Sequence, residues 1–118
     1  MKIGERQAGD ISILDIDGRI MFGDGEEDFC EAVTRVIESG RVKLVLNMAE
    51  VPYIDSAGIS QLVRTFVTVG KRGGRMKLLN LSKRVREVLN VTRLLSVWDA
   101  YDSEEQATAS FAEAPRTG

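Results

Sequence analysis

The sequence contains no histidine and only one cysteine among its 118 residues. Without histidine, the chain cannot form a Ser-His-Asp triad, a Cys-His pair or a histidine metal site. The lone cysteine, Cys30, can form neither an internal disulfide nor a cysteine zinc cluster, and an unpaired thiol is usual in the cytoplasm. We therefore expect no metal ion, no other cofactor and no enzymatic activity.

The chain also lacks an excess of positive charge and a long apolar run. Its 16 basic and 18 acidic residues give a net charge of −2, which does not suit a protein that binds nucleic acid through phosphates. No apolar run reaches the roughly 18 residues that a membrane helix requires. The first seven residues contain no apolar core of a secretory signal. We therefore expect a cytoplasmic protein that contacts neither nucleic acid nor a membrane.

Strand-like apolar runs alternate with helical spacing along the chain. Residues 42–48 are almost continuously apolar, which is typical of a parallel strand buried on both faces. Such alternation predicts a single α/β domain with a mixed, mostly parallel sheet of four to five strands and about four helices. The expected strands are residues 2–7, 11–17, 42–48, 76–81 and 96–101, and the expected helices begin near residues 25, 56, 82 and 103, with Ser82 and Ser103 as candidate N-caps and the second helix ending at Gly70.

The segment Asp55-Ser56-Ala57-Gly58 lies between the buried strand and an amphipathic helix. Ser56 falls at or near the helix N-terminus, where serine commonly serves as the N-cap. Alternatively, Ser56 is exposed at this corner and can be modified, because a phosphate there would meet free N–H groups and the positive end of the helix dipole. A nucleophilic-serine hydrolase fits less well, because the segment lacks the first glycine of the Gly-x-Ser-x-Gly elbow and no histidine can act as a base.

Several segments together resemble a STAS domain, the fold of bacterial anti-sigma factor antagonists. Besides the Asp55-Ser56-Ala57-Gly58 element, they are Gly18, Val45-Leu46-Asn47-Met48, Gly73-Gly74, the stretch from Leu79 to Leu94, and Ser103-Glu104-Glu105. The resemblance covers residues 2–112, so we expect a STAS domain over residues 1–112 and a disordered C-terminal tail over residues 113–118.

The resemblance implies a phosphorylation switch. In this family the unphosphorylated antagonist binds an anti-sigma factor that is also a serine kinase, and this releases the sigma factor for transcription. The kinase phosphorylates the serine of the Asp-Ser-x-Gly element, which weakens the complex, and a serine phosphatase restores it. By this match Ser56 is the phosphoacceptor. The expected partner-binding residues are Asp55, Ala57, Gly58, Ile59, Ser60, Gly23, Asp24 and Asn47.

This chain differs from the family pattern at two of these positions. The family often has aspartate where this chain has Asn47, and glycine where it has Ser60. Ser60 is a second serine one turn further on, and we expect it to lie inside the helix and to be less accessible than Ser56. A STAS accessory subunit, of a lipid-transport complex or a signalling scaffold, is the alternative function; there the Ser56 corner would dock without phosphorylation.

Two charged clusters and one apolar pair have simpler interpretations. The acidic residues 24–28 suit the start of a helix, and their spacing is not that of an EF-hand loop. The basic residues around the third helix form either a solvated face or a contact for an acidic partner; they are Lys83, Arg84, Arg86 and Arg93. Met21 and Phe22 either pack into the core or offer apolar surface to a partner.

Overall fold

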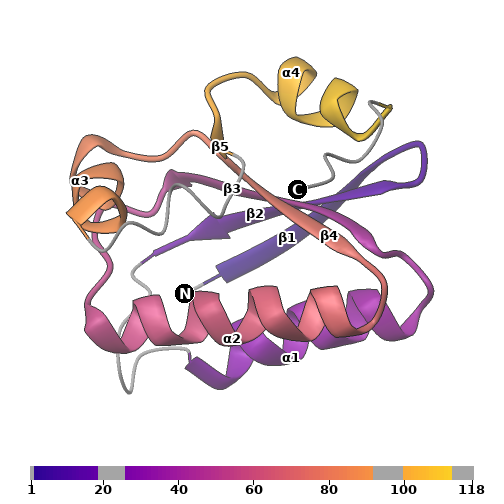
Figure 1. The fold of residues 1–118 in the computed structure, drawn as a ribbon, viewed down its shortest axis with the longest axis horizontal. Helices are drawn as coiled ribbons and strands as arrows, with labels where there is room; N and C mark the ends of the chain where they lie inside the picture. Colours follow the sequence, from indigo (N-terminus) through magenta and orange to yellow (C-terminus); the bar gives the residue numbers. More distant parts are fainter. Residues whose placement is uncertain (1, 19–25, 92–99, 113–118) are drawn as a thin grey trace.

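A five-stranded sheet runs through the residues that the computed structural model describes, which are 2–18, 26–91 and 100–112 (Figure 1). Its strands lie side by side in the order in which they occur in the chain. They are β1 (Lys2–Ala8), β2 (Ile11–Asp17), β3 (Lys43–Glu50), β4 (Arg75–Leu79) and β5 (Ala100–Tyr101).

The first two strands form an antiparallel hairpin, and all later pairs are parallel. The hairpin turns at Gly9, whose φ of 63° is unfavourable for residues with a side chain. Parallel neighbours require crossover connections, and the helices supply them. The mixed, mostly parallel sheet predicted from the sequence is therefore confirmed.

Helices cover both faces of this sheet. In Figure 1, α1 (Glu26–Glu38) and α2 (Ser56–Lys71) lie together on one face, and α4 (Glu104–Ala109) lies on the other. The short helix α3 (Lys83–Val91) lies at one end of the sheet, and its buried residues Val85 and Leu89 join the core on the side of α1 and α2. A 3₁₀ turn, η2 (Ser110–Ala112), continues α4.

The central strand β3 is buried on both faces, as its apolar run predicts. Leu44, Leu46 and Met48 point into the larger core, which also contains residues of α1, α2 and α3. Val45 points the other way, into a smaller cluster with Ala107 and Phe111 beneath α4. Because β2, β3 and β4 are parallel, their carboxyl ends lie together along one edge of the sheet.

Several element ends differ from the expected ones. β3 continues to Glu50 instead of ending at residue 48, and α2 continues to Lys71. β4 ends at Leu79 because Asn80 has a φ of 58°, which breaks the strand. The Asn80 N–H still donates to the Tyr101 carbonyl of β5 at 2.9 Å. Only the last two residues of the expected strand 96–101 lie within the described residues.

The two expected serine caps are present. The Ser103 side chain accepts a hydrogen bond from the Gln106 N–H, and the Ser82 hydroxyl accepts one from the Val85 N–H at 3.2 Å. Among the described helices, none is both long enough and apolar enough to cross a lipid bilayer. The expected tail over residues 113–118 lies outside the described residues.

Candidate functional site

The connection between β3 and α2 forms a fixed corner at the carboxyl edge of the sheet. Val51 and Ile54 are buried and anchor this connection to the larger core. The Val51 N–H donates to the Met48 carbonyl at 3.0 Å, which turns the chain away from the strand. The packing of Val51 and Ile54 in the core therefore fixes the position of the chain just before Asp55.

Asp55, not Ser56, is the N-cap of α2. Its backbone is extended, with φ −97° and ψ −177°, and its carboxylate accepts the Gly58 N–H at 2.8 Å. The Asp55 carbonyl accepts the Ile59 N–H at 2.9 Å, which closes the first turn. The interpretation of Ser56 as the N-cap is therefore wrong, because the preceding carboxylate already occupies the capping position.

Ser56 is the first residue of the helix, and its side chain is exposed. No described residue forms a hydrogen bond with its hydroxyl group. The Ser56 and Ala57 N–H groups likewise have no partner among the described residues. A negative group on the Ser56 hydroxyl would therefore lie near free N–H donors and the positive end of the helix dipole.

Ser60 lies one turn along the helix and differs from Ser56 in its contacts. Its hydroxyl donates to the Ser56 carbonyl at 3.1 Å, a bond made within the helix. Its side chain is exposed, as that of Ser56 is, and it lies inside the helix as expected; that Ser60 is less accessible than Ser56 stays a prediction. Gly58 is buried at the corner, and Ala57 and Ile59 are partly exposed beside it.

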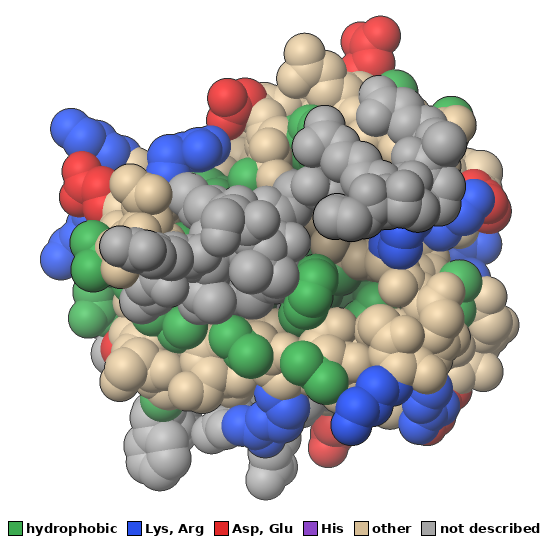
Figure 2. Space-filling model, viewed as in Figure 1, with side chains coloured by type: hydrophobic (Ala, Val, Ile, Leu, Met, Phe, Trp, Pro, Cys, Tyr) green, Lys and Arg blue, Asp and Glu red, His purple; other side chains and the backbone are tan. Residues whose placement is uncertain are grey.

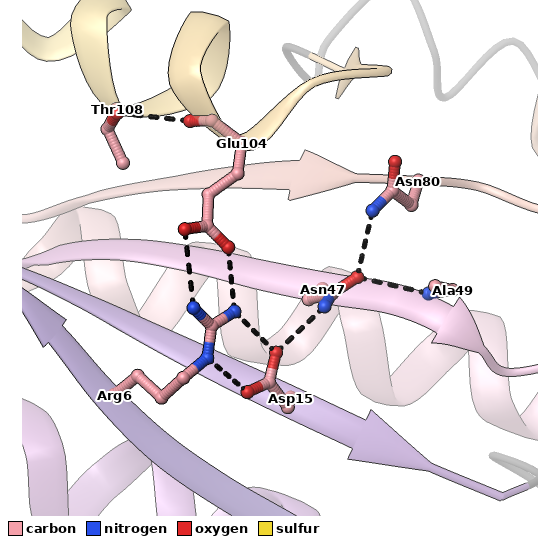
Figure 3. A network of polar contacts seen from close by, with 7 residues as sticks. All are labelled: Arg6, Asp15, Asn47, Ala49, Asn80, Glu104 and Thr108. Atoms are coloured by element: carbon pink, nitrogen blue, oxygen red, sulfur yellow. Dashed lines mark hydrogen bonds and ion pairs between the residues drawn. The ribbon is translucent and has the colours of Figure 1, made fainter.

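Asn47 does not join this corner. It lies on β3 with its side chain toward α4, in a polar network with Asp15 of β2 and Asn80 (Figure 3). The Asn47 amide donates to Asp15 Oδ1 at 2.8 Å, and its oxygen accepts from Asn80 Nδ2 at 3.3 Å and from the Ala49 N–H at 3.2 Å. These hydrogen bonds link β2, β3 and the segment after β4, and none of them involves Ser56.

Arg6 of β1 sits at the centre of the charges in this network (Figure 3). Its guanidinium donates two bonds to the Asp15 carboxylate and two to Glu104 of α4. The hydrogen bond from Arg6 lowers the pKa of Asp15 below its ordinary value, against the desolvation that would raise it. The network therefore ties α4 to the hairpin, and sequence patterns gave no sign of it because its members lie up to 98 residues apart.

The basic cluster expected around the third helix contacts the corner at one point. The Arg84 guanidinium lies over the Tyr53 ring, 5.1 Å from its centroid, in a cation–π contact. Arg86 pairs instead with Asp102 at 3.1 Å, and Lys83 is exposed. Tyr53 was not singled out from the sequence, and only its position three residues before Ser56 could have indicated it.

The other sequence predictions at this site fall on residues that the structure does not describe. Gly23, Asp24, Met21, Phe22 and Arg93 lie outside the described residues. Within the part of the chain that is described, no three cysteine, aspartate or glutamate side chains lie together in a way that could hold a metal ion.

Comparison with known proteins identifies the family. The family model of the STAS domain matches residues 3–107. The anti-sigma-B factor antagonist of Bacillus subtilis is 36% identical over 69 residues, which are 58% of this chain and 62% of that protein. Among solved structures, TM1081 of Thermotoga maritima superposes with a TM-score of 0.87 at 21% identity, covering 94% of this chain and 95% of that one.

A second solved structure has a chemically modified state. SpoIIAA of Bacillus, in its phosphorylated form, superposes with a TM-score of 0.71 at 19% identity, covering 93% of this chain and 99% of that one. At these identities the two structures support the fold, and the family model supports the assignment over most of the chain. The chain therefore belongs to the STAS domain family.

Proposed function

We propose that this protein is an anti-sigma factor antagonist switched by phosphorylation of Ser56. The unphosphorylated form binds an anti-sigma factor serine kinase through the corner at Asp55, Ser56 and Ala57, and so releases the sigma factor. Phosphorylation weakens this complex, and a serine phosphatase reverses it. The B. subtilis relative is named for antagonism of an anti-sigma factor, which supports the same role here.

The observation that carries the proposal is that Asp55 supplies the helix cap, which leaves the Ser56 side chain without a structural role in the cap. Asp55 caps the helix, and the Ser56 hydroxyl is exposed without a hydrogen bond to any described residue. A phosphate on Ser56 therefore removes no contact that the fold needs. It adds a charge of about −1.5 to −2 at a surface position, where it acts on the docked partner.

The energy that such a switch requires is modest. A hundredfold loss of affinity corresponds to about 3 kcal/mol. One phosphate forced against a closely packed protein surface can supply this amount, because it must be desolvated or must displace the partner. A chain of net charge −2 would nearly double its negative charge, with the whole change at one corner.

Phosphorylation with a matched serine control tests the proposal. The protein is incubated with ATP and each purified anti-sigma factor kinase of the source organism, and the labelled residue is located by mass spectrometry. We expect label on Ser56 in the wild type and in Ser60→Ala, and none in Ser56→Ala. Label confined to Ser60, or no label with any kinase, would contradict the proposal; the second result would favour the accessory-subunit alternative.

Binding by two variants tests the charge effect separately. Ser56→Ala and Ser56→Asp are both expected to fold like the wild type, because the cap is made by Asp55. Only Ser56→Asp should lose affinity for the kinase, by at least tenfold in an equilibrium titration. Equal affinity of Ser56→Asp and wild type would refute a switch based on charge.

A further inference from the structure

The outward face of α2 carries two exposed apolar side chains. Val63 and Val67 are 36% and 46% exposed, and they follow Ser56 and Ser60 at helical spacing. The opposite face of the helix is buried, at Gly58, Gln61, Leu62, Thr65 and Val69. Figure 2 shows hydrophobic side chains along the region of α2, with lysine and arginine side chains gathered below them. The two exposed valines therefore lie about two and three turns beyond the Ser56 corner, on the same side of α2.

A groove runs beside this face, between α2 and β4. It has a volume of about 170 Å³. It is lined on the helix by Phe66, Val69 and Gly70, and on the strand side by Gly74, Arg75, Met76 and Lys77. Phe66 follows Val63 by three residues and Gly70 follows Val67 by three, so the groove borders the exposed valines. A side chain built on Gly70 would meet nothing within 4 Å, which shows that the groove is open at this point. Such a groove can receive an apolar side chain of a docked protein.

The charge of the helix limits what can dock there. Residues 56–71 contain Arg64 and Lys71 but no acidic residue, and Arg72 follows directly. A second copy of the chain packed on the same face would bring these cations together, which costs energy. A partner with an apolar surface bordered by aspartate or glutamate would instead match both the valines and the cations.

We propose that the partner of the Ser56 corner also docks along the outward face of α2, with an apolar surface bordered by acidic residues. Val63 and Val67 form the apolar part of this second contact, and Lys71 forms its charged part. The inference rests on the function proposed above, since it assigns the partner a larger contact than the corner alone. Phosphorylation at Ser56 then dissociates the partner, although part of the binding affinity comes from residues up to about four helical turns from Ser56.

Titration with the kinase that phosphorylates Ser56 tests this proposal. Val67→Asp is compared with the wild type and with Val91→Asp, a matched change at a valine that is 83% exposed on α3. We expect Val67→Asp to raise the Kd at least tenfold and Val91→Asp to change it less than twofold. Circular dichroism should show that both variants are folded, because both valines are exposed.

The outcomes separate the two proposals. If Ser56→Asp weakens binding and Val67→Asp binds like the wild type, the α2 contact is refuted and the phosphorylation switch stands. If no anti-sigma factor kinase binds the wild type, the proposed function fails and the α2 contact fails with it. Lys71→Glu tests whether acidic residues of the partner contact Lys71. We expect a severalfold higher Kd for the kinase, and a Kd that depends less on salt concentration than that of the wild type. Unchanged values would rule out an acidic border on the partner.

Discussion

Replacing Asn47 by aspartate, the residue that the family often has there, should destabilise this particular chain. Asn47 donates to the Asp15 carboxylate at 2.8 Å. In Asn47→Asp this donor is lost, and two carboxylates face each other on neighbouring strands. The Arg6 guanidinium is already shared between Asp15 and Glu104, so it does not neutralise a third carboxylate fully.

The magnitude follows from these contacts. A hydrogen bond to a charged group contributes about 1.5–3 kcal/mol. Repulsion between two charges about 4 Å apart adds about 1 kcal/mol in water and about 4 kcal/mol at an effective dielectric constant of 20. The Asp15 side chain is 37% exposed, which favours the lower end of both ranges. We therefore expect a loss of about 2.5 kcal/mol in the free energy of unfolding at pH 7.

The pH dependence of this loss is the sharper test. Arg6 favours ionisation of one carboxylate of the pair, and that charge opposes ionisation of the second, so the pKa of the second step is raised in the folded variant above its unfolded value. A raised pKa means that the folded variant gains stability relative to wild type as the pH falls. The deficit of Asn47→Asp should accordingly shrink between pH 7 and pH 4.5.

Urea unfolding followed by circular dichroism measures the deficit at each pH. Asn47→Ala is the control, because it removes the donor to Asp15, together with the two bonds that the Asn47 oxygen accepts, without adding a charge. Its deficit should not change over this pH range. An Asn47→Asp variant as stable as wild type at pH 7 would refute the reasoning. A deficit independent of pH would refute the assignment of its cause to the carboxylate pair.

Three further predictions concern stability and are measured by urea or thermal unfolding. The pKa of Asp15 is lowered by its guanidinium partner, so its stabilising effect is present above pH about 4 and lost as the pH falls through the folded pKa; Asp15→Asn should flatten the acid decline in stability, and an unchanged decline would contradict this. Asp55→Ala should cost about 1 kcal/mol through loss of the N-cap, and a neutral effect would show that the cap is made otherwise. Gly70→Ala should stabilise by about 0.5–1 kcal/mol, because its Cβ enters open space in a helix. Gly74→Ala should destabilise instead, because its Cβ would lie 2.6 Å from the Val42 carbonyl oxygen, and the opposite order of these two variants would refute the geometry.

The sequence predicted the elements of the fold because their signals are local. The apolar run of β3 and the helical spacing of α2 each result from burial of one short segment, and a hydrophobic pattern records burial directly. The ends were less predictable. The strand before Asn80 ends two residues earlier than expected because Asn80 has a φ of 58°, and the apolar pattern of the segment does not record this backbone conformation.

The sequence likewise predicted part of the candidate site and left part of it undecided. The Asp55-Ser56-Ala57-Gly58 element identified the corner, but not which of its first two residues is the cap, because aspartate and serine are about equally good N-caps. The backbone geometry decided it, since the Asp55 carboxylate reaches the Gly58 N–H. Asn47 was grouped with the corner on the family pattern, whereas the pleat of β3 turns it toward α4 and away from the neighbouring Leu46 and Met48.

The sequence by itself thus determined the type of fold, the location of the serine corner and the absence of a histidine to activate it. These depend on residue type and on periodicity, which short segments carry. Only the tertiary structure decided that Asp55 caps the helix, that Arg6 joins Asp15 to Glu104, and that Val63 and Val67 are exposed on α2. These depend on which segments meet in space, and contacts across up to 98 residues leave no pattern in the intervening sequence.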